Sequence, residues 1–197
     1  MKFATAAILA GGKSSRMGFD KQLLTDRTQR MLSLVSAHLR EEFPDILVVT
    51  SRPELYRDMD VRTCADAFAG RGPLAGIQAA LENSKSEYVY LLACDMPIVC
   101  LPYIRYMKEC LRASNAPICL TRRQERYEPF NAFYSRSLLD ALTKRLQTGS
   151  SSLFYFISTS APQVIEEEEA AAFDGDMRMF TNINTRSEYE AYLDGRV

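Results

Sequence analysis

Short apolar runs of strand length alternate with helical patterns along this chain, and that alternation constrains the fold more than any other feature. The runs span residues 3–9, 46–50, 61–64, 88–93, 116–121 and 130–134; helical patterns at 3.6-residue spacing cover 28–43, 73–83, 102–114 and 137–147. Parallel strands need crossover connections of this kind. The sequence therefore predicts an α/β fold with a doubly wound, mostly parallel sheet and helices on both faces.

The end of the chain and the stretch before residue 134 add detail to this pattern. The pattern at residues 122–134 predicts a short antiparallel segment. Residues 179–183 are predicted to form a last strand, which leads into a helix over 185–193. With 197 residues and no internal repeat or long linker, residues 1–197 are expected to form a single domain.

Charge and cysteine content exclude several classes of function. The formal net charge of -1 leaves no general positive field to attract nucleic acid or an anionic membrane. The five cysteines include no C-x-x-C pair and the chain has one histidine, which argues against an ordinary zinc site. The N-terminal apolar stretch is too short to span a membrane. We therefore expect buried, reduced thiols in a cytoplasmic protein.

A glycine turn accompanied by cations follows the first predicted strand: Gly11 and Gly12, then Lys13, Arg16 and Lys21. Glycines let backbone N–H groups approach a polyphosphate, and the cations then neutralise its charge. The kinase-type P-loop does not fit, because its spacing would need glycine where Ala7 stands inside the strand. The remaining alternative is a structural turn with solvated side chains.

Asp95 comes directly after the predicted strand 88–93, in the sequence Cys94-Asp95-Met96-Pro97. Ligands of open α/β sheets bind beyond the carboxyl ends of the strands. A carboxylate fixed there is suited to hold a hard divalent cation against phosphate oxygens. A turn-capping role for Asp95 is equally compatible with the sequence.

Two further segments lie where a ligand could bind. Gly72 and Pro73 begin a predicted helix, and a helix N-terminus presents N–H groups to an anion or a nucleoside edge. Asn182 and Asn184 are two residues apart on an extended segment, so both amides can face one site. An ordinary loop and cap in the first segment, and helix-capping asparagines in the second, remain the alternatives.

Taken together and in this order, these segments resemble the MobA-like nucleotidyltransferases. The similarity rests on LAGGKSSRMGFDK at 9–21, Asp66, GPLAG at 72–76, CDMP at 94–97, Glu128-Pro129 and NINT at 182–185. It implies a Rossmann-like fold with nucleotide contacts from Leu9, Ala10, Gly11, Gly12, Lys21, Asp66, Gly72, Pro73 and Asp95. The last of these would bind through Mg²⁺, and Asn182 and Asn184 would face the acceptor.

The resemblance also implies a reaction: transfer of GMP from GTP to molybdopterin. Lys13, Arg16 and Lys21 would offset phosphate charge, and Asp95 would hold Mg²⁺. Cytidylyl relatives usually carry Ala-Ala-Gly where this chain has Ala10-Gly11-Gly12, which favours guanine.

The chain departs from the family pattern at two places, Thr50-Ser51-Arg52 and Arg186. Two alternatives to guanylyl transfer stay open, a cytidylyltransferase of molybdopterin or of a sugar-like phosphate and a catalytically silent nucleotide-binding module. An enzyme that receives the product is a candidate partner.

Overall fold

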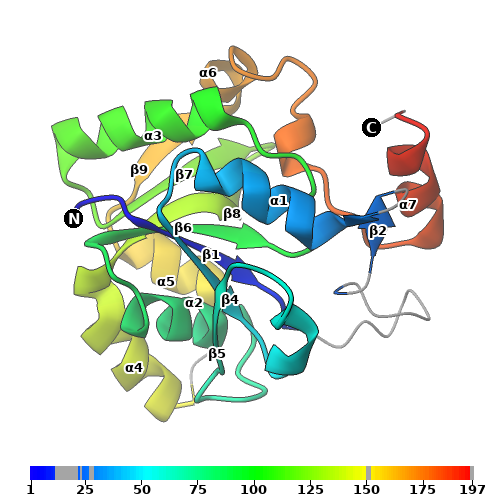
Figure 1. Cartoon of the computed structure of the whole chain (residues 1–197). Helices are drawn as coiled ribbons and strands as arrows, with labels where there is room; N and C mark the ends of the chain where they lie inside the picture. Colours follow the sequence, from blue (N-terminus) through cyan, green and yellow to red (C-terminus); the bar gives the residue numbers. More distant parts are fainter. Residues whose placement is uncertain (12–21, 23, 27–28, 150–151, 196–197) are drawn as a thin grey trace.

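The computed structural model describes residues 1–11, 22, 24–26, 29–149 and 152–195. Its main sheet has seven strands in the order β5-β4-β1-β6-β8-β7-β9 (Figure 1). The strands are β1 (Thr5–Leu9), β4 (Asp45–Val49), β5 (Arg62–Cys64), β6 (Tyr88–Ala93), β7 (Ile118–Arg123), β8 (Arg126–Ser135) and β9 (Gln163–Glu166). Within this sheet only β8 runs antiparallel to its neighbours. The predicted doubly wound fold and the predicted antiparallel segment are confirmed.

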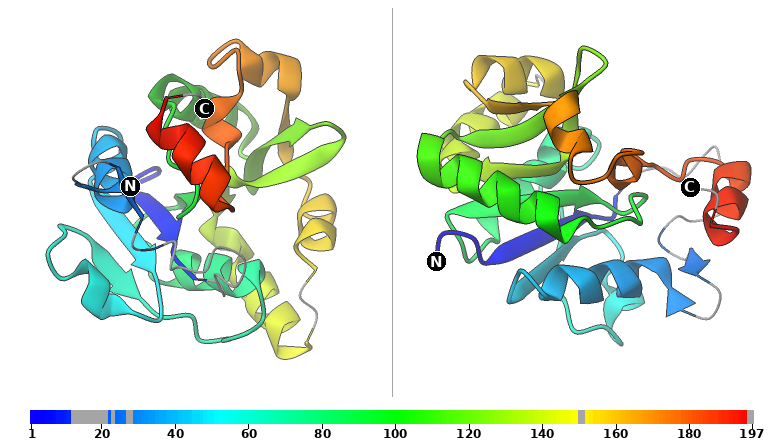
Figure 2. Two further views of the ribbon diagram at one scale, coloured as in Figure 1. Left: turned by 90° about the vertical axis from the view of Figure 1, so that its right-hand side faces the viewer. Right: turned by 90° about the horizontal axis from the view of Figure 1, so that it is seen from above.

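Helices cover both faces of the sheet (Figures 1 and 2). One face carries α1 (Met31–Arg40), α3 (Leu101–Ser114) and α6 (Glu167–Ala171); the other carries α2 (Pro73–Glu82), α4 (Leu139–Gln147) and α5 (Leu153–Thr159). Successive residues of β1 alternate between the two cores, with Ala6 and Ile8 on the α1/α3 face and Ala7 and Leu9 on the other. Beyond their first residues the central strands β1, β4 and β6 are therefore apolar at every position, and this is why the sequence shows continuous apolar runs there.

The predicted strand at 179–183 is wrong. This segment forms a short 3₁₀ turn, η4 (Arg178–Phe180), followed by an extended stretch outside the sheet. Its backbone N–H groups find partners other than a neighbouring strand: that of Met179 donates to Asp174 Oδ2 at 2.8 Å and that of Phe180 to the Met177 carbonyl at 3.0 Å. The apolar pattern arises because Met179, Phe180 and Ile183 are buried in the core.

Smaller differences concern the first helix and the cysteines. Helix α1 begins at Met31 because a two-stranded ribbon, β2 (Thr25–Asp26) with β3 (Gln29–Arg30), precedes it. The cysteines form no disulfide; Cys119 is buried as expected, but the other four are only partly buried. Strand β9 and helix α5 were not expected. The last helix, α7 (Arg186–Leu193), lies one residue from its predicted start.

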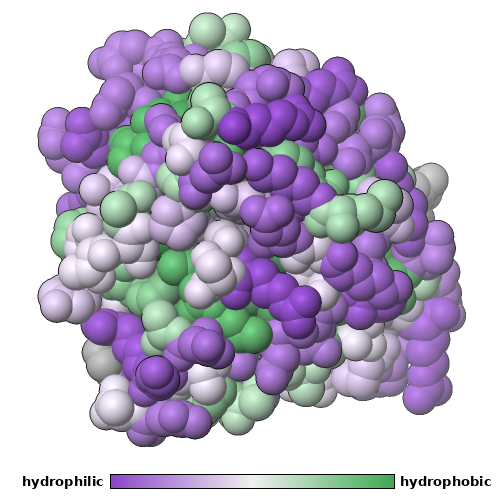
Figure 3. All heavy atoms as spheres, turned by 90° about the vertical axis from the view of Figure 1, so that its left-hand side faces the viewer, coloured by the Kyte–Doolittle hydropathy of each residue, from purple (hydrophilic) through white to green (hydrophobic). Residues whose placement is uncertain are grey.

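The amino ends of the strands form the face shown in Figure 3, where hydrophilic side chains surround small apolar areas. No helix among the described residues is long and apolar enough to cross a membrane.

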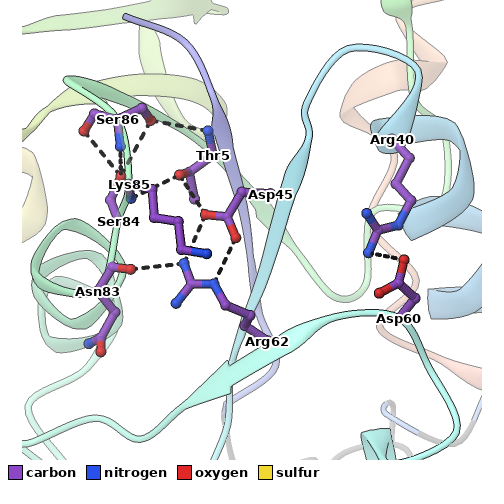
Figure 4. Close-up of polar contacts among 9 residues, drawn as sticks. All are labelled: Thr5, Arg40, Asp45, Asp60, Arg62, Asn83, Ser84, Lys85 and Ser86. Carbon is purple, nitrogen blue, oxygen red and sulfur yellow. Dashed lines mark hydrogen bonds and ion pairs between the residues drawn. The ribbon is translucent and has the colours of Figure 1, made fainter. Parts of the chain in front are cut away.

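At the amino ends of the strands the Asp45 carboxylate accepts hydrogen bonds from Arg62 Nε at 2.7 Å, Arg62 Nη2 at 2.8 Å and Thr5 Oγ1 at 2.8 Å (Figure 4). Burial raises the pKa of Asp45, but these hydrogen bonds and the Arg62 charge outweigh burial and lower the pKa.

We expect Asp45→Asn to lower the free energy of unfolding by about 1.5–3 kcal/mol at neutral pH, the usual worth of hydrogen bonds to a charged group. Because the folded-state pKa is lowered, this stabilisation is present above the unfolded carboxyl's pKa and is lost as pH falls through the folded pKa. Denaturant unfolding of the wild type and of Asp45→Asn at neutral pH and at about pH 3 measures this stabilisation. If the difference in free energy of unfolding between the wild type and Asp45→Asn were the same at the two pH values, the electrostatic account would be contradicted.

Candidate functional site

The carboxyl ends of β1, β4, β5 and β6 meet at one edge of the sheet, which faces the viewer in the left panel of Figure 2. Leu9, the last residue of β1, pairs in register with Val49 of β4 and Ala93 of β6. The Ala10 N–H donates to the Val49 carbonyl at 2.9 Å and the Cys94 N–H to the Leu9 carbonyl at 3.1 Å. The chain leaves β1 toward β4 and β5 and returns on the other side at β6, which makes this edge the topological switch point.

The first predicted contact segment lies at the centre of this edge. Leu9 and Ala10 are buried, whereas Gly11 is exposed. A Cβ built on Gly11 would meet no atom of the described residues within 4 Å, so these residues leave the space beside it open. The other residues of the glycine turn that were singled out from the sequence, Gly12, Lys13, Arg16 and Lys21, lie outside the described residues.

Gln22 is a buried residue at this edge that sequence reasoning missed. Its Oε1 accepts hydrogen bonds from Thr50 Oγ1 at 3.1 Å and Tyr56 OH at 2.8 Å, and its carbonyl accepts one from Arg30 Nη2 at 2.8 Å. The Thr50 hydroxyl also accepts from the Arg52 N–H at 3.0 Å. Thr50 therefore helps to anchor Gln22. No motif signals Gln22, because its partners come from distant segments.

Asp95 lies in the turn directly after β6, on the other side of β1 from β4. Its backbone carbonyl accepts a hydrogen bond from the Ile183 N–H at 2.8 Å, and the Met96 N–H closes the turn on the Ala93 carbonyl at 3.1 Å. The described residues contain no group of three or more His, Cys, Asp or Glu side chains that could hold a metal. A site with one or two carboxylates completed by phosphate oxygens and water is the usual arrangement for Mg²⁺, and Asp95 fits it.

Asp66 lies on the opposite flank of the site, two residues beyond β5. Its Oδ1 accepts a hydrogen bond from the Phe68 N–H at 2.6 Å, which closes the loop that leads to α2. Strand β5 is three places from β6 in the sheet, and three spacings amount to about 14 Å. The two aspartates therefore lie at opposite ends of this part of the carboxyl edge.

Helix α2 starts beside the centre of this site. Gly72 adopts a φ of 71°, a conformation that favours glycine, and Pro73 occupies the first helical turn. No described side chain caps this N-terminus. Gly76 brings the helix close to β1, because a Cβ there would lie 3.2 Å from Leu9 Cδ1. The helix N-terminus is thus held against the strand that carries the glycine turn.

The segment with Asn182 and Asn184 lies on the Asp95 flank. Ile183 is fully buried between them, whereas Asn184 is exposed and Asn182 partly so, as expected for residues two apart on an extended chain. Asn182 Nδ2 donates to the Phe180 carbonyl at 3.1 Å. The capping alternative is wrong for both asparagines, because Thr185 is the N-cap of α7 and forms a capping box with Glu188.

The Glu128-Pro129 stretch lies on the β7–β8 hairpin, which projects beyond the sheet on the same side as α7 (Figure 2, left). Burial raises the pKa of the Glu128 carboxyl, and the nearby Arg123 charge opposes that rise. Arg123 Nη1 lies 3.6 Å from Glu128 Oε1, and its guanidinium lies 5.9 Å from the centre of the Phe180 ring. The hairpin therefore contacts the segment that leads to Asn182.

Known proteins of one family are similar to this chain. The family model of the MobA-like NTP transferase domain matches residues 6–163. The molybdenum cofactor guanylyltransferase of Syntrophotalea carbinolica is 47% identical over 192 residues, which cover 98% of this chain and 91% of the relative. A probable molybdenum cofactor guanylyltransferase of Peptoclostridium acidaminophilum is 38% identical over 195 residues, covering 96% and 88%.

Solved structures show the same fold. Molybdopterin-guanine dinucleotide biosynthesis protein A from Archaeoglobus fulgidus superposes with a TM-score of 0.83 at 23% identity, covering 98% of each chain. A CMP:2-keto-3-deoxy-manno-octonic acid synthetase complexed with CTP has a TM-score of 0.71 at 9% identity, covering 100% of this chain and 98% of the other. On the family model and the two sequence relatives, the chain belongs to the MobA-like NTP transferase family.

Proposed function

We propose that this protein transfers GMP from GTP to the terminal phosphate of molybdopterin, giving the guanine dinucleotide form of the cofactor and pyrophosphate. The observation that carries the proposal is the arrangement at the carboxyl edge of the sheet, where Leu9, Ala10 and Gly11 lie between Asp66 on one flank and Asp95 on the other. The sequence relatives named as guanylyltransferases support the choice of nucleotide and acceptor.

The two flanks suggest how GTP lies in the site. The nucleoside would occupy the β4/β5 side, near Asp66 and the start of α2, and the phosphates would cross β1 toward Asp95. There Asp95 would hold Mg²⁺, which supplies charge neutralisation at the phosphate oxygens. Lys13, Arg16 and Lys21, which lie outside the described residues, would offset the remaining negative charge.

The acceptor would approach from the Asp95 flank, where Asn182 and Asn184 lie. Its phosphate monoester attacks the α-phosphorus of GTP in line, and pyrophosphate leaves with the electron pair of the broken P–O bond. Phosphate oxygens are ionised at neutral pH, so this nucleophile needs no general base. The chain's one histidine, His38, is exposed on α1 and is not required. Positioning and charge stabilisation suffice for the reaction.

The fold does not decide between bases, since a CTP-binding synthetase shares it. A cytidylyltransferase of molybdopterin or of a sugar-like phosphate is therefore the second candidate, and a catalytically silent nucleotide-binding module is the third. Pyrophosphate release measured with each of the four NTPs, with and without molybdopterin and Mg²⁺, separates the three. The proposed reaction draws on cytoplasmic GTP, and cytoplasm is the compartment we propose.

We expect GTP to be used at least about tenfold better than CTP or ATP in kcat/KM, the scale of discrimination that small steric differences supply. Gly11→Ala should narrow this advantage, because it fills the open space beside the base and makes the loop resemble that of cytidylyl relatives. A Cβ at Gly11 would meet no atom within 4 Å in the part of the chain that the structure describes, and the φ of this residue is not positive, so the melting temperature should not change. Equal use of CTP and GTP by the wild-type protein would contradict the guanylyl assignment.

A further inference from the structure

Asn131 of β8 is a buried polar residue with an unusual backbone. It is 2% exposed, its φ is 56°, and it lies where the register between β7 and β8 shifts. Positive φ is uncommon for residues other than glycine, although asparagine tolerates it better than most. A buried polar side chain in such a conformation needs hydrogen-bond partners, and Asn131 has them on two different segments.

The first partner is Tyr90 in the middle of β6, whose hydroxyl donates to Asn131 Oδ1 at 2.5 Å. Burial raises the pKa of Tyr90 well above its usual value, so the hydroxyl keeps its proton and acts as the donor. With Oδ1 accepting, Asn131 Nδ2 is free to donate, and it does so to the Met179 carbonyl at 3.3 Å. The side chain thus links the central sheet to η4.

The segment that begins at Met179 is fixed at a second point four residues later. There the Ile183 N–H donates to the backbone carbonyl of Asp95 at 2.8 Å. Asn182 and Asn184 flank that second point. Asn131 at one end and the Asp95 turn at the other therefore add two hydrogen-bonded anchors to a stretch that burial of Met179, Phe180 and Ile183 also holds in place.

We infer that Asn131 is a positioning residue for the acceptor: through the Met179 carbonyl it holds Asn182 and Asn184 in place relative to Asp95. The inference rests on the proposed function for the identity of the acceptor, but the anchoring itself does not. Asn131 is buried and touches no substrate; its effect passes through the backbone of 179–184. Loss of the bond to Met179 should loosen acceptor binding and leave the nucleotide flank unchanged.

Three substitutions separate the two hydrogen bonds. Asn131→Asp can still accept from Tyr90 and, when ionised, cannot donate to the Met179 carbonyl. Asn131→Gly accepts the positive φ and removes both bonds, and it covers the case in which a buried carboxylate prevents folding. Tyr90→Phe removes the first bond and leaves Asn131 able to donate to Met179. Asp45→Asn is the matched control, because it removes the charge and one acceptor oxygen of a hydrogen-bonded group at the opposite end of the strands (Figure 4).

With GTP and molybdopterin as substrates, Asn131→Asp and Asn131→Gly should raise KM for molybdopterin about two- to tenfold, the scale of losing one hydrogen bond. The KM for GTP should stay within about twofold of wild type on the same scale, and Tyr90→Phe and Asp45→Asn should change neither KM by more than that. If Asn131 had only a structural role, its substitution would lower stability and either raise the KM for both substrates together or change neither KM. Either of these two results would overturn the inference.

Amide hydrogen exchange tests the anchoring without turnover. In Asn131→Asp and Asn131→Gly the amides of residues 179–184 should exchange faster than in the wild type, whereas those of β1 and β4 should not. Unchanged exchange at 179–184 in both variants would overturn the inference. If the wild-type protein did not turn over molybdopterin but exchange rose as expected, the proposed function would fail while the anchoring held.

Discussion

Asp95→Asn is expected to lower kcat by at least about a hundredfold, the scale of losing one group that stabilises transition-state charge. Asparagine keeps the size of the side chain and one acceptor oxygen, but it lacks the charge that holds Mg²⁺. The hydrogen bond that ties this turn to Ile183 should remain, because it uses the Asp95 backbone carbonyl. Steady-state kinetics over a range of Mg²⁺ concentrations measures the loss of kcat, and a thermal melt measures whether the fold is kept.

Asp66→Asn provides the matched control for this variant. Asparagine Oδ1 can still accept the Phe68 N–H, so the loop before α2 is kept. Because Asp66 lies on the other flank, its substitution should change KM for GTP without changing the Mg²⁺ concentration needed for half-maximal activity. Turnover like that of the wild type in Asp95→Asn at ordinary Mg²⁺ would rule out Asp95 as the metal ligand.

Lys21→Ala is expected to lower kcat by about ten- to a thousandfold, again the scale of one charge-stabilising contact. Lys21 lies outside the described residues, but the next residue, Gln22, is buried at the carboxyl edge against Thr50 and Tyr56. A cation that meets charge growing on pyrophosphate acts in the transition state, so its loss lowers kcat, whereas loss of uniform binding changes only KM.

Lys144→Ala, at an exposed position of α4, serves as the control for removal of one lysine and should leave kcat and the KM for GTP unchanged. Single-turnover measurements of the two variants separate chemistry from product release. If Lys21→Ala raised KM for GTP and left kcat as in the wild type, the proposed role of Lys21 would be wrong.

The sequence was sufficient to predict the parallel part of the fold because β1, β4 and β6 are buried on both faces and are therefore apolar apart from Thr5 and Asp45. It also placed Asp95 correctly, since a residue that follows a buried strand must emerge at the carboxyl edge. The strand predicted at 179–183 failed for a related reason. Burial of Met179 and Ile183 produces an apolar pattern whether or not the backbone joins a sheet, and periodicity alone does not distinguish the two.

Residues whose role depends on distant partners could not be predicted from the sequence. Gln22 is held by Thr50 and Tyr56, and Asn131 by Tyr90 and Met179, across separations of 28 to 48 residues. No local pattern marks such pairs, because each hydrogen bond forms only once the sheet has brought its strands together. Strand β9 escaped detection in a similar way, since its four residues pair with β7 from far along the chain.

The most direct test of guanylyl transfer follows the phosphorus atoms of GTP. The protein is incubated with molybdopterin, Mg²⁺ and GTP labelled at either the α- or the γ-phosphorus. Guanylyl transfer predicts that the α label enters a molybdopterin product that also contains guanine, while the γ label leaves in pyrophosphate. Transfer of the γ label to molybdopterin, or its release as inorganic phosphate with no labelled product, would contradict guanylyl transfer.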